Sequence, residues 1–342
     1  MKSIYTSQAA QSSELIDKAK RIVITSHKSP DGDAVGSSLG LQQFLLSLHK
    51  EVTVILPDGA DAYLHWMTGY ADIVLFEENP TGAEELIAQA DLLFVLDYNN
   101  YSRTGEAMEK VLRKHNRPVI MIDHHQQPEP ISLVEYSDTS ACSTSEMVYM
   151  FIQSISPNTK LSLGGIEALY CGIMTDSGSF RFPSVTPDTH LIVAEMMALG
   201  LDHARIHREV YDTNLLDRLR LVGFALSEKL EVWENCATAI ISLTQDELKK
   251  YNHRPGDTEG LVNQALSIKD IKLAVFLREG NNEVKLSFRS KGNFDVNQFA
   301  RGSWNGGGHK NAAGARTEET LIGAIARLKN ELSAIADQIV QS

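Results

Sequence analysis

The segment of this 342-residue chain with the clearest chemical potential is VIMIDHH, residues 119–125. It is an apolar run that ends in a carboxylate, Asp123, followed by two imidazoles, His124 and His125. Three more apolar runs also end in Asp or His, in RIVITSHKSPDGD (21–33), DLLFVLD (91–97) and ALYCGIMTD (168–176). Carboxylate and imidazole groups without thiolates suit Mn²⁺ or Mg²⁺ better than structural zinc.

Strands of an open parallel sheet end along one edge, which is where such sheets bind ligands. If the apolar runs share that edge, they bring six candidate ligands to one cleft: His27, Asp31, Asp33, Asp97, His124 and Asp176. With Asp123 the cleft would hold five carboxylates, which repel one another unless cations bind or protons are taken up. Two divalent ions would resolve this conflict.

The spacing of β-rich runs predicts the elements that position these residues. Runs at 22–26, 52–56, 73–76, 92–97 and 119–122 alternate with helical patterns, which predicts a parallel sheet. A helix is expected from Ala34 to Leu48, with its N-terminus just after Asp31-Gly32-Asp33. Further helices are expected over 140–155, from about 161 to 174, and over 187–199, where Pro187 suits the first turn and Gly200 ends the helix.

After residue 200 the sequence pattern changes. A charged helical stretch over 203–230 indicates a connector, and strands are expected at 236–243, 271–279 and 283–290, with a hairpin at 280–282. A glycine cluster, GGGHKNAAG, is expected to form a flexible turn or loop and precedes a final helix over about 318–340. The chain is therefore expected to be α/β: a doubly wound, mainly parallel domain at 1–200, a helical linker at 201–220, and a smaller α/β domain at 221–342.

Composition narrows the class of protein. Hydrophobic residues make up 43% and charged residues 22%, as in globular proteins, and the net charge of −12 disfavours binding of long duplex nucleic acid. No signal peptide or membrane-spanning run is evident, so we expect a cytoplasmic protein without a membrane partner. Three widely spaced cysteines, Cys142, Cys171 and Cys236, are expected to be free thiols.

Each candidate site also has an ordinary structural interpretation. Pro30-Asp31-Gly32 is common turn material, Asp97 could cap a helix, and Asp176 could cap a turn. Their joint occurrence, in an order that a doubly wound sheet would bring together, favours the metal site.

These motifs resemble those of a known family. HKSPDGDAVGSSLG, Asp97, Asp123-His124-His125 and Thr175-Asp176-Ser177-Gly178 resemble the four motifs of the DHH phosphoesterases, and FRS and GGGHKNAAG resemble their DHHA1 substrate-binding domain. The resemblance covers nearly the whole chain and is greatest to the nanoRNase and 3′-phosphoadenosine 5′-phosphate phosphatase branch. It implies two Mn²⁺ ions, with Mg²⁺ or Co²⁺ as alternatives. One would be held by His27, Asp31 and Asp97, and the other by Asp33, Asp97, His124 and Asp176.

The resemblance also implies roles for other residues. A hydroxide shared by the two ions would attack phosphorus, Asp123 would orient an imidazole, and His125 would polarise the phosphate or protonate the leaving oxygen. Substrate-binding residues would be Arg289, Ser290, Gly306, Gly307, Gly308 and His309. Phe180, Arg181 and Lys310 could add stacking or charge, although each could equally be packing or surface.

The expected function is manganese-dependent hydrolysis of short oligoribonucleotides to mononucleotides, together with removal of the 3′-phosphate of 3′-phosphoadenosine 5′-phosphate. The expected partners are short single-stranded RNA or DNA oligonucleotides and bisphosphorylated nucleosides. Closure through residues 201–220 would set the longest substrate. A phosphodiesterase of cyclic or linear dinucleotides is an alternative, and an inorganic pyrophosphatase is a further one. An alternative from another functional class is a nucleotide-binding module without catalysis. A homodimer is also possible.

Overall fold

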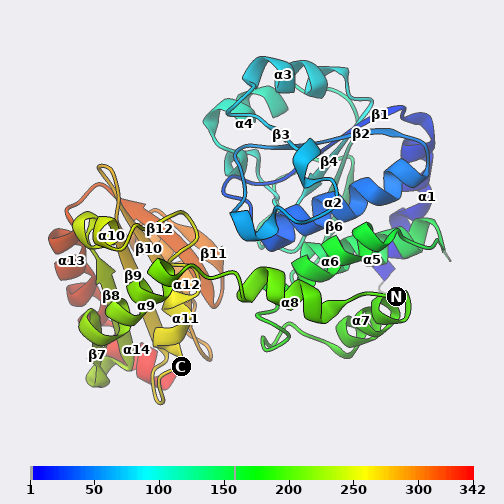
Figure 1. Ribbon diagram of the computed structural model, residues 1–342. Helices are drawn as coiled ribbons and strands as arrows, with labels where there is room; N and C mark the ends of the chain where they lie inside the picture. Colours follow the sequence, from blue (N-terminus) through cyan, green and yellow to red (C-terminus); the bar gives the residue numbers. More distant parts are fainter. Residues whose placement is uncertain (1–2, 158) are drawn as a thin grey trace. The chain divides into compact units, whose positions relative to one another are not determined.

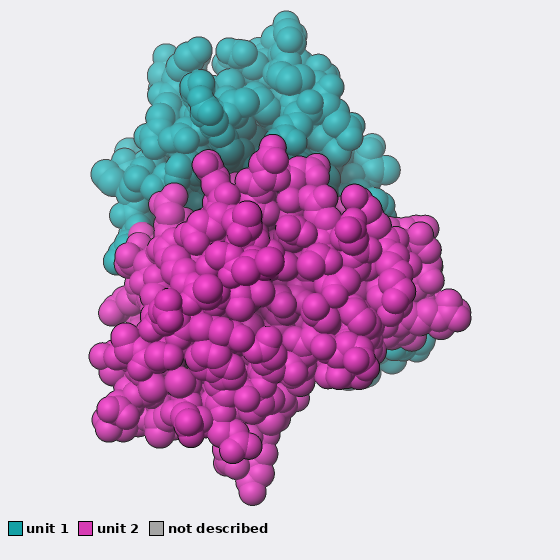
Figure 2. Space-filling model, turned by 90° about the vertical axis from the view of Figure 1, so that its left-hand side faces the viewer, with its two compact units in different colours: residues 1–213 teal, residues 214–342 magenta. Residues whose placement is uncertain are grey.

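The computed structural model describes residues 3–157 and 159–342. The chain divides into two compact units, Met1–Thr213 and Asn214–Ser342, which are coloured separately in Figure 2. Each unit has its own sheet and its own hydrophobic core (Figure 1). Within the described residues, none of the helices combines the length and the apolar character that crossing a bilayer requires.

The first unit is built on a six-stranded parallel sheet with the order β3-β2-β1-β4-β5-β6. The strands are β1 (Arg21–Thr25), β2 (Glu51–Leu56), β3 (Val74–Leu75), β4 (Leu92–Leu96), β5 (Val119–Asp123) and β6 (Val134–Ser137). Because β1 lies between β2 and β4, the winding of the sheet reverses beside β1, and the crevice at such a switch point is where doubly wound sheets bind ligands. The predicted fold class is confirmed.

Alternating strand residues bury against helices on both faces of this sheet (Figure 1). Ile22 and Ile24 of β1 join the core formed with α1 (Ser3–Lys18), α2 (Gly32–Ser47), α5 (Thr144–Ile155) and α6 (Leu163–Asp176). Val23 points to the opposite core, formed with α3 (Pro80–Gln89) and α4 (Glu106–Leu112). The first core also includes residues of α7 (Pro187–Ala198) and α8 (His203–Tyr211).

A stripe of glycines lets α2 and α6 approach closely. Gly32, Gly36 and Gly40 recur every fourth residue and so lie on one face of α2. A Cβ on Gly36 would lie 2.4 Å from the Ala168 carbonyl oxygen, and one on Gly32 would lie 2.4 Å from Thr175 Oγ1. Only glycine fits at such distances, so the stripe fixes how near the first turn of α2 lies to the last turn of α6.

The second unit has a mixed sheet with the order β11-β12-β10-β9-β8-β7, in which β8 and β9 pair in parallel and the other neighbours are antiparallel. Its strands are β7 (Leu230–Trp233), β8 (Thr238–Leu243), β9 (Leu273–Glu279), β10 (Val284–Ser290), β11 (Gly307–His309) and β12 (Ala312–Thr317). One face packs on α12 (Val296–Ser303), α13 (Leu321–Ala334) and α14 (Ala336–Gln341). The other packs on α9 (Leu216–Glu228), α10 (Gln245–Lys250) and α11 (Leu261–Leu266).

Several local expectations differ from the structure. The stretch over 203–230 is two helices, because Leu215 has an extended backbone; Ile206 of α8 packs in the first unit and Leu221 of α9 in the second. The glycine cluster is a strand pair, β11 and β12, rather than a loop. Strand β6 and helices α10, α11 and α12 were not predicted, and the final helix divides at Ile335.

Candidate metal centre

The six predicted ligands lie at the ends of four segments in the first unit. His27, Asp97 and His124 follow the carboxyl ends of β1, β4 and β5. Asp31 caps the N-terminus of α2, and Asp33 lies in the first turn of that helix. Asp176 is the last residue of α6, so it is delivered by a helix and not by a strand end. Because Asp33 lies on α2 and Asp176 on α6, the close glycine contact between these helices determines how near the two carboxylates lie.

Two groups of donor atoms result, each with its atoms within 4.8 Å of one another: His27 with Asp31 and Asp97, and Asp33 with His124 and Asp176. Asp97 joins them. Its Oδ2 lies 3.3 Å from His27 Nε2, and its Oδ1 lies 3.5 Å from His124 Nε2. His124 Nε2 is in turn 3.5 Å from Asp176 Oδ2 and 3.9 Å from Asp33 Oδ2.

The backbone at Asp97 is unusual. Its φ is 63°, in the left-handed region that few residues other than glycine adopt. The bend ends strand β4 and turns the carboxylate between two histidines, with the residue only 2% exposed. Strain of this kind persists where the surrounding structure holds it, and it clusters at functional sites.

Both histidines present Nε2 to the carboxylates because Nδ1 is occupied elsewhere. His27 Nδ1 lies 3.0 Å from the Lys28 carbonyl oxygen, and His124 Nδ1 lies 3.3 Å from that of Ala141. Donation from Nδ1–H to these carbonyls turns Nε2 toward the carboxylates, where a cation would take the place of the Nε2 proton. Metal-bound histidines are oriented by the same arrangement.

Electrostatic conflict in this buried cluster perturbs several pKa values. Burial raises the pKa of Asp33 well above its usual value, and the neighbouring Asp97 and Asp176 carboxylates add to that effect. Burial alone would lower the pKa of His124, but Asp176, Asp97 and Asp33 raise it to about 9. Burial would raise the pKa of Asp97, yet its hydrogen bond with His27 and the adjacent imidazoles lower it. Protons partly balance the acids here, as divalent cations would.

The donor set fits such cations. It consists of carboxylate oxygens and imidazole nitrogens, the ligands that Mn²⁺ and Mg²⁺ accept, and no cysteine takes part. The three cysteines are buried free thiols, as expected from their spacing.

The N-terminus of α5 holds Asp33, which the sequence did not indicate. The backbone N–H groups of Thr144 and Ser145 donate to Asp33 Oδ2 and Oδ1 at 2.6 and 2.8 Å. Thr144 Oγ1 also donates to Asp97 Oδ1 at 2.9 Å. The Ser/Thr-rich start of α5 is visible in the sequence, but such starts are common helix caps and do not indicate a contact with Asp33 or Asp97.

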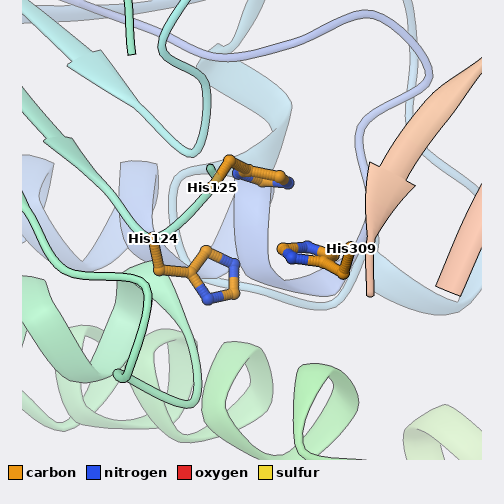
Figure 3. A group of neighbouring side chains, drawn as sticks. All are labelled: His124, His125 and His309. Carbon is orange, nitrogen blue, oxygen red and sulfur yellow. The ribbon is translucent and has the colours of Figure 1, made fainter. Parts of the chain in front are cut away.

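Asp123 and His125 form a pair at the end of β5 that adjoins the cluster, because His125 Nδ1 also lies 3.7 Å from Asp97 Oδ1. Asp123 is fully buried; its Oδ1 lies 2.7 Å from His125 Nδ1, and its Oδ2 accepts the His125 backbone N–H at 2.9 Å. The rings of His124 and His125 are neighbours (Figure 3), and they meet edge to face, with an interplanar angle of 75°. Burial lowers the pKa of His125, although Asp123 opposes that effect.

The predicted substrate residues of the second unit lie on neighbouring strands. Arg289 and Ser290 end β10, and Arg289 is opposite Ala312 of β12, which pairs with the glycine strand β11 that ends in His309, also drawn in Figure 3. Ser290 Oγ donates to the Phe294 carbonyl and accepts from Asn311, so its hydroxyl is used within the fold.

Gly306, just before β11, and Gly308 within it serve backbone packing. A Cβ on Gly306 would lie 2.2 Å from the Gly314 carbonyl oxygen, and Gly308 has a φ of 152°. The Gly308 N–H donates to Oδ1 of Asn297, a buried residue of α12 that also accepts from Arg301 Nε at 3.0 Å. Sequence reasoning missed Asn297, because a single amide in an unpredicted helix gives no signal.

The three residues proposed to add stacking or charge have local partners. Phe180 packs against the first unit's core, near Tyr170 and His190. Arg181 Nε donates to the Gly178 carbonyl at 2.7 Å, and Lys310 Nζ to Asn293 Oδ1 at 3.1 Å.

Comparison with known proteins places the chain in a family. The model of the DHH family N-terminal domain matches residues 21–173, and that of the DHHA1 domain matches residues 236–342. The bifunctional oligoribonuclease and PAP phosphatase NrnA of Thermus thermophilus is 31% identical over 304 residues, covering 86% of this chain and 83% of that protein. The cyclic-di-AMP phosphodiesterase GdpP of Geobacillus thermodenitrificans is 28% identical over 323 residues, 91% of this chain but 46% of that protein.

A solved structure agrees with this assignment. The crystal structure of an exopolyphosphatase-related protein from Bacteroides fragilis has 38% sequence identity and a TM-score of 0.94, with 97% of each chain covered. The chain therefore belongs to the DHH family of phosphoesterases and carries a DHHA1 domain in its second unit.

Proposed function

We propose that this chain uses Mn²⁺ to hydrolyse short oligoribonucleotides to mononucleotides and to remove the 3′-phosphate of 3′-phosphoadenosine 5′-phosphate. Hydrolysis of phosphate ester bonds follows from its family, and the substrates are the proposal. The observation that carries it is the meeting of two donor groups at one buried carboxylate, Asp97. The similarity to NrnA supports the choice of substrates.

The donor groups suit two divalent ions. Nε2 of His27 with Asp31 and Asp97 would hold one, and Asp33, His124 and Asp176 with a second oxygen of Asp97 would hold the other. Such a pair of ions lowers the pKa of a coordinated water and stabilises negative charge on phosphoryl oxygens. Mg²⁺ and Co²⁺ suit the same donors, and cellular availability decides among them.

The protein's own groups would supply orientation and proton transfer. Asp123 fixes the His125 ring through Nδ1, and His125 Nε2 would carry a proton to the leaving oxygen. Because burial lowers the pKa of His125, this imidazolium would be a stronger acid than an exposed one. No covalent intermediate with a protein side chain is required.

We assign recognition of the substrate's terminal phosphate or nucleotide to the second unit. Arg289 offers a planar cation that can bind a phosphate with two hydrogen bonds. His309 and the β11 glycines are on the strand pair beside it. A cytoplasmic location and a homodimer stay predictions.

A second candidate activity is hydrolysis of a cyclic dinucleotide, because the chain also resembles GdpP. The chain spans about half the length of that protein.

Turnover of three substrates in Mn²⁺ separates these functions: a linear diribonucleotide, a cyclic dinucleotide and 3′-phosphoadenosine 5′-phosphate. We expect hydrolysis of the linear diribonucleotide and of 3′-phosphoadenosine 5′-phosphate. Among oligomers we expect a preference for lengths of about two to five nucleotides, and the acidic surface gives this preference only weak support. Exclusive turnover of the cyclic dinucleotide would favour the second candidate. Rapid degradation of a long strand with dinucleotides untouched would contradict both. If the wild-type and Asp97→Asn proteins turned over substrate equally, the activity would come from a contaminant and a binding module would be the better description.

A further inference from the structure

We propose that Thr144 is a positioning residue that couples Asp33 to Asp97 and thereby sets the direction in which both carboxylates face the divalent ions. The inference rests on the proposed metal centre. It assigns a role to a residue that is not itself a ligand in that proposal.

Thr144 reaches both carboxylates with different atoms. Its backbone N–H donates to Asp33 Oδ2 at 2.6 Å, and its hydroxyl donates to Asp97 Oδ1 at 2.9 Å. Asp33 belongs to one donor group, and Asp97 joins the two groups. One fully buried residue therefore connects them directly.

The hydrogen bond from the Thr144 hydroxyl restricts the χ2 torsion of Asp97, which would otherwise rotate easily. The χ2 angle of an aspartate is broad, so a carboxylate between two cations could rotate unless a neighbour fixes one oxygen. Thr144 fixes Oδ1, and Oδ2 then faces His27 Nε2 at 3.3 Å. A hydroxyl also stabilises the charged form of the carboxylate, because an ionised carboxylate only accepts hydrogen bonds.

Thr144 is itself held in place from both sides. Ser143 caps α5 by accepting the Glu146 N–H at 3.0 Å. The buried Glu146 side chain accepts the Cys142 N–H at 2.9 Å and the Thr189 hydroxyl of α7 at 2.5 Å. The β-branched side chain of Thr144 also has few rotamers, so its hydroxyl keeps one direction.

A purely structural interpretation is that Thr144 is an ordinary first-turn residue of a helix. It accounts for the backbone bond to Asp33, since any residue supplies an N–H. It does not account for the side-chain bond to Asp97, which needs a hydroxyl. The two interpretations therefore differ in what happens when only the hydroxyl is removed.

Thr144→Val removes the hydroxyl at nearly constant shape, and Thr144→Ser keeps it. Asn79→Ala is the matched control, because it removes the cap of another helix of the first unit, α3, which contributes no residue to either donor group. Mn²⁺ affinity would be measured on chelator-treated protein from the electron paramagnetic resonance signal of free Mn²⁺. Thermal unfolding and kcat and KM on a diribonucleotide would be measured alongside.

We expect Thr144→Val to weaken Mn²⁺ binding by about 10- to 100-fold, the usual effect of losing a group that orients a metal ligand, and to lower kcat with little change in KM. Thr144→Ser should restore both. Asn79→Ala should lower the Tm yet leave Mn²⁺ affinity near that of the wild type. If Thr144→Val does not fold, Thr144→Ala replaces it.

Wild-type Mn²⁺ affinity and kcat in a folded Thr144→Val or Thr144→Ala protein would overturn the inference and leave the proposed function intact. So would equal loss of affinity in Thr144→Val and Asn79→Ala. If the wild-type protein itself bound no Mn²⁺, the proposed function would fail instead.

Discussion

The two units differ in how their predicted functional residues are held. In the first unit the acid cluster is largely buried, and its histidines and Asp33 are fixed by backbone groups. In the second unit the glycine strand is half-buried and held by strand pairing and one amide, Asn297. Buried like charges are unstable unless something compensates them, so the proposed metal-binding role of the first unit depends on its electrostatics. The proposed substrate-binding role of the second unit depends instead on how its strands are arranged.

This contrast has a consequence for mutation. A change in the first unit should alter a preorganised centre and reduce kcat. A change in the second unit should weaken substrate binding and raise KM.

Asp97→Asn should have the largest effect, because it removes one charge from the carboxylate that joins both donor groups. We expect kcat to fall by at least about 10²- to 10³-fold, the range seen when a preorganised electrostatic contact is lost. Glu106→Gln, whose side chain is 85% exposed, is the control and should leave kcat unchanged. Steady-state kinetics in Mn²⁺ gives both values. If kcat of the Asp97→Asn enzyme were within threefold of the wild-type value, the expected difference between the two units in their effects on kcat and KM would be wrong.

Arg289→Ala in the second unit should raise KM by about 10- to 100-fold, because a hydrogen bond to a charged group contributes about 1.5–3 kcal/mol. Arg316→Ala on β12, where the side chain is 73% exposed, is the matched control. Initial rates over a range of dinucleotide concentrations separate KM from kcat. A loss confined to kcat would mean that the second unit acts on the chemical step.

The pH dependence of Mn²⁺ binding tests whether Mn²⁺ displaces a proton from His124. The pKa of His124 is raised to about 9, so in the metal-free protein at neutral pH this imidazole carries a proton that Mn²⁺ must displace. Affinity should therefore rise with pH, by about tenfold per unit for each proton released, and level off above pH about 9. Calorimetric titration in buffers of different ionisation enthalpy counts the protons. Constant affinity between pH 7 and 9 would show that His124 is not displaced.

Gly36→Ala should have the smallest effect on chemistry and act through packing. Its Cβ would meet the Ala168 carbonyl oxygen at 2.4 Å, so α2 and α6 must separate, at a cost of about 1–3 kcal/mol in unfolding free energy. Because Asp33 and Asp176 lie on these two helices, Mn²⁺ affinity should fall with stability. In Gly223→Ala, on α9, the added Cβ meets nothing within 4 Å, so that variant should be as stable as the wild type or slightly more. Urea unfolding measures both. Equal stability of the two variants would rule out the close helix contact.

The sequence predicted the parallel sheet and the six clustered side chains because apolar runs ending in Asp or His are a strong, periodic signal. Asp97 is an example: it directly follows LLFVL and lies where the sheet's winding reverses. Its left-handed backbone could not be predicted, because it depends on tertiary contacts on both sides. Thr144 was missed for a related reason, since a threonine at a helix start is common and its bond to Asp97 spans 47 residues.

The second unit was harder to predict. Gly306, Gly307 and Gly308 were expected to form a flexible loop, because glycine disfavours strands when considered locally. Close backbone approach to β12 overrides that preference, and only the folded sheet shows it. Helix α6 shows the same limit: its apolar run was expected to end near Met174, yet the helix continues to Asp176 and carries that carboxylate to the cluster.

Anomalous scattering from a crystal soaked in Mn²⁺ and a short oligonucleotide tests the metal centre most directly. We expect two Mn²⁺ peaks in the first unit. One should lie within bonding distance of His27 and Asp31, the other within bonding distance of His124 and Asp176, and both should contact Asp97. Peaks elsewhere on the chain, or none among these side chains at saturating Mn²⁺, would contradict it.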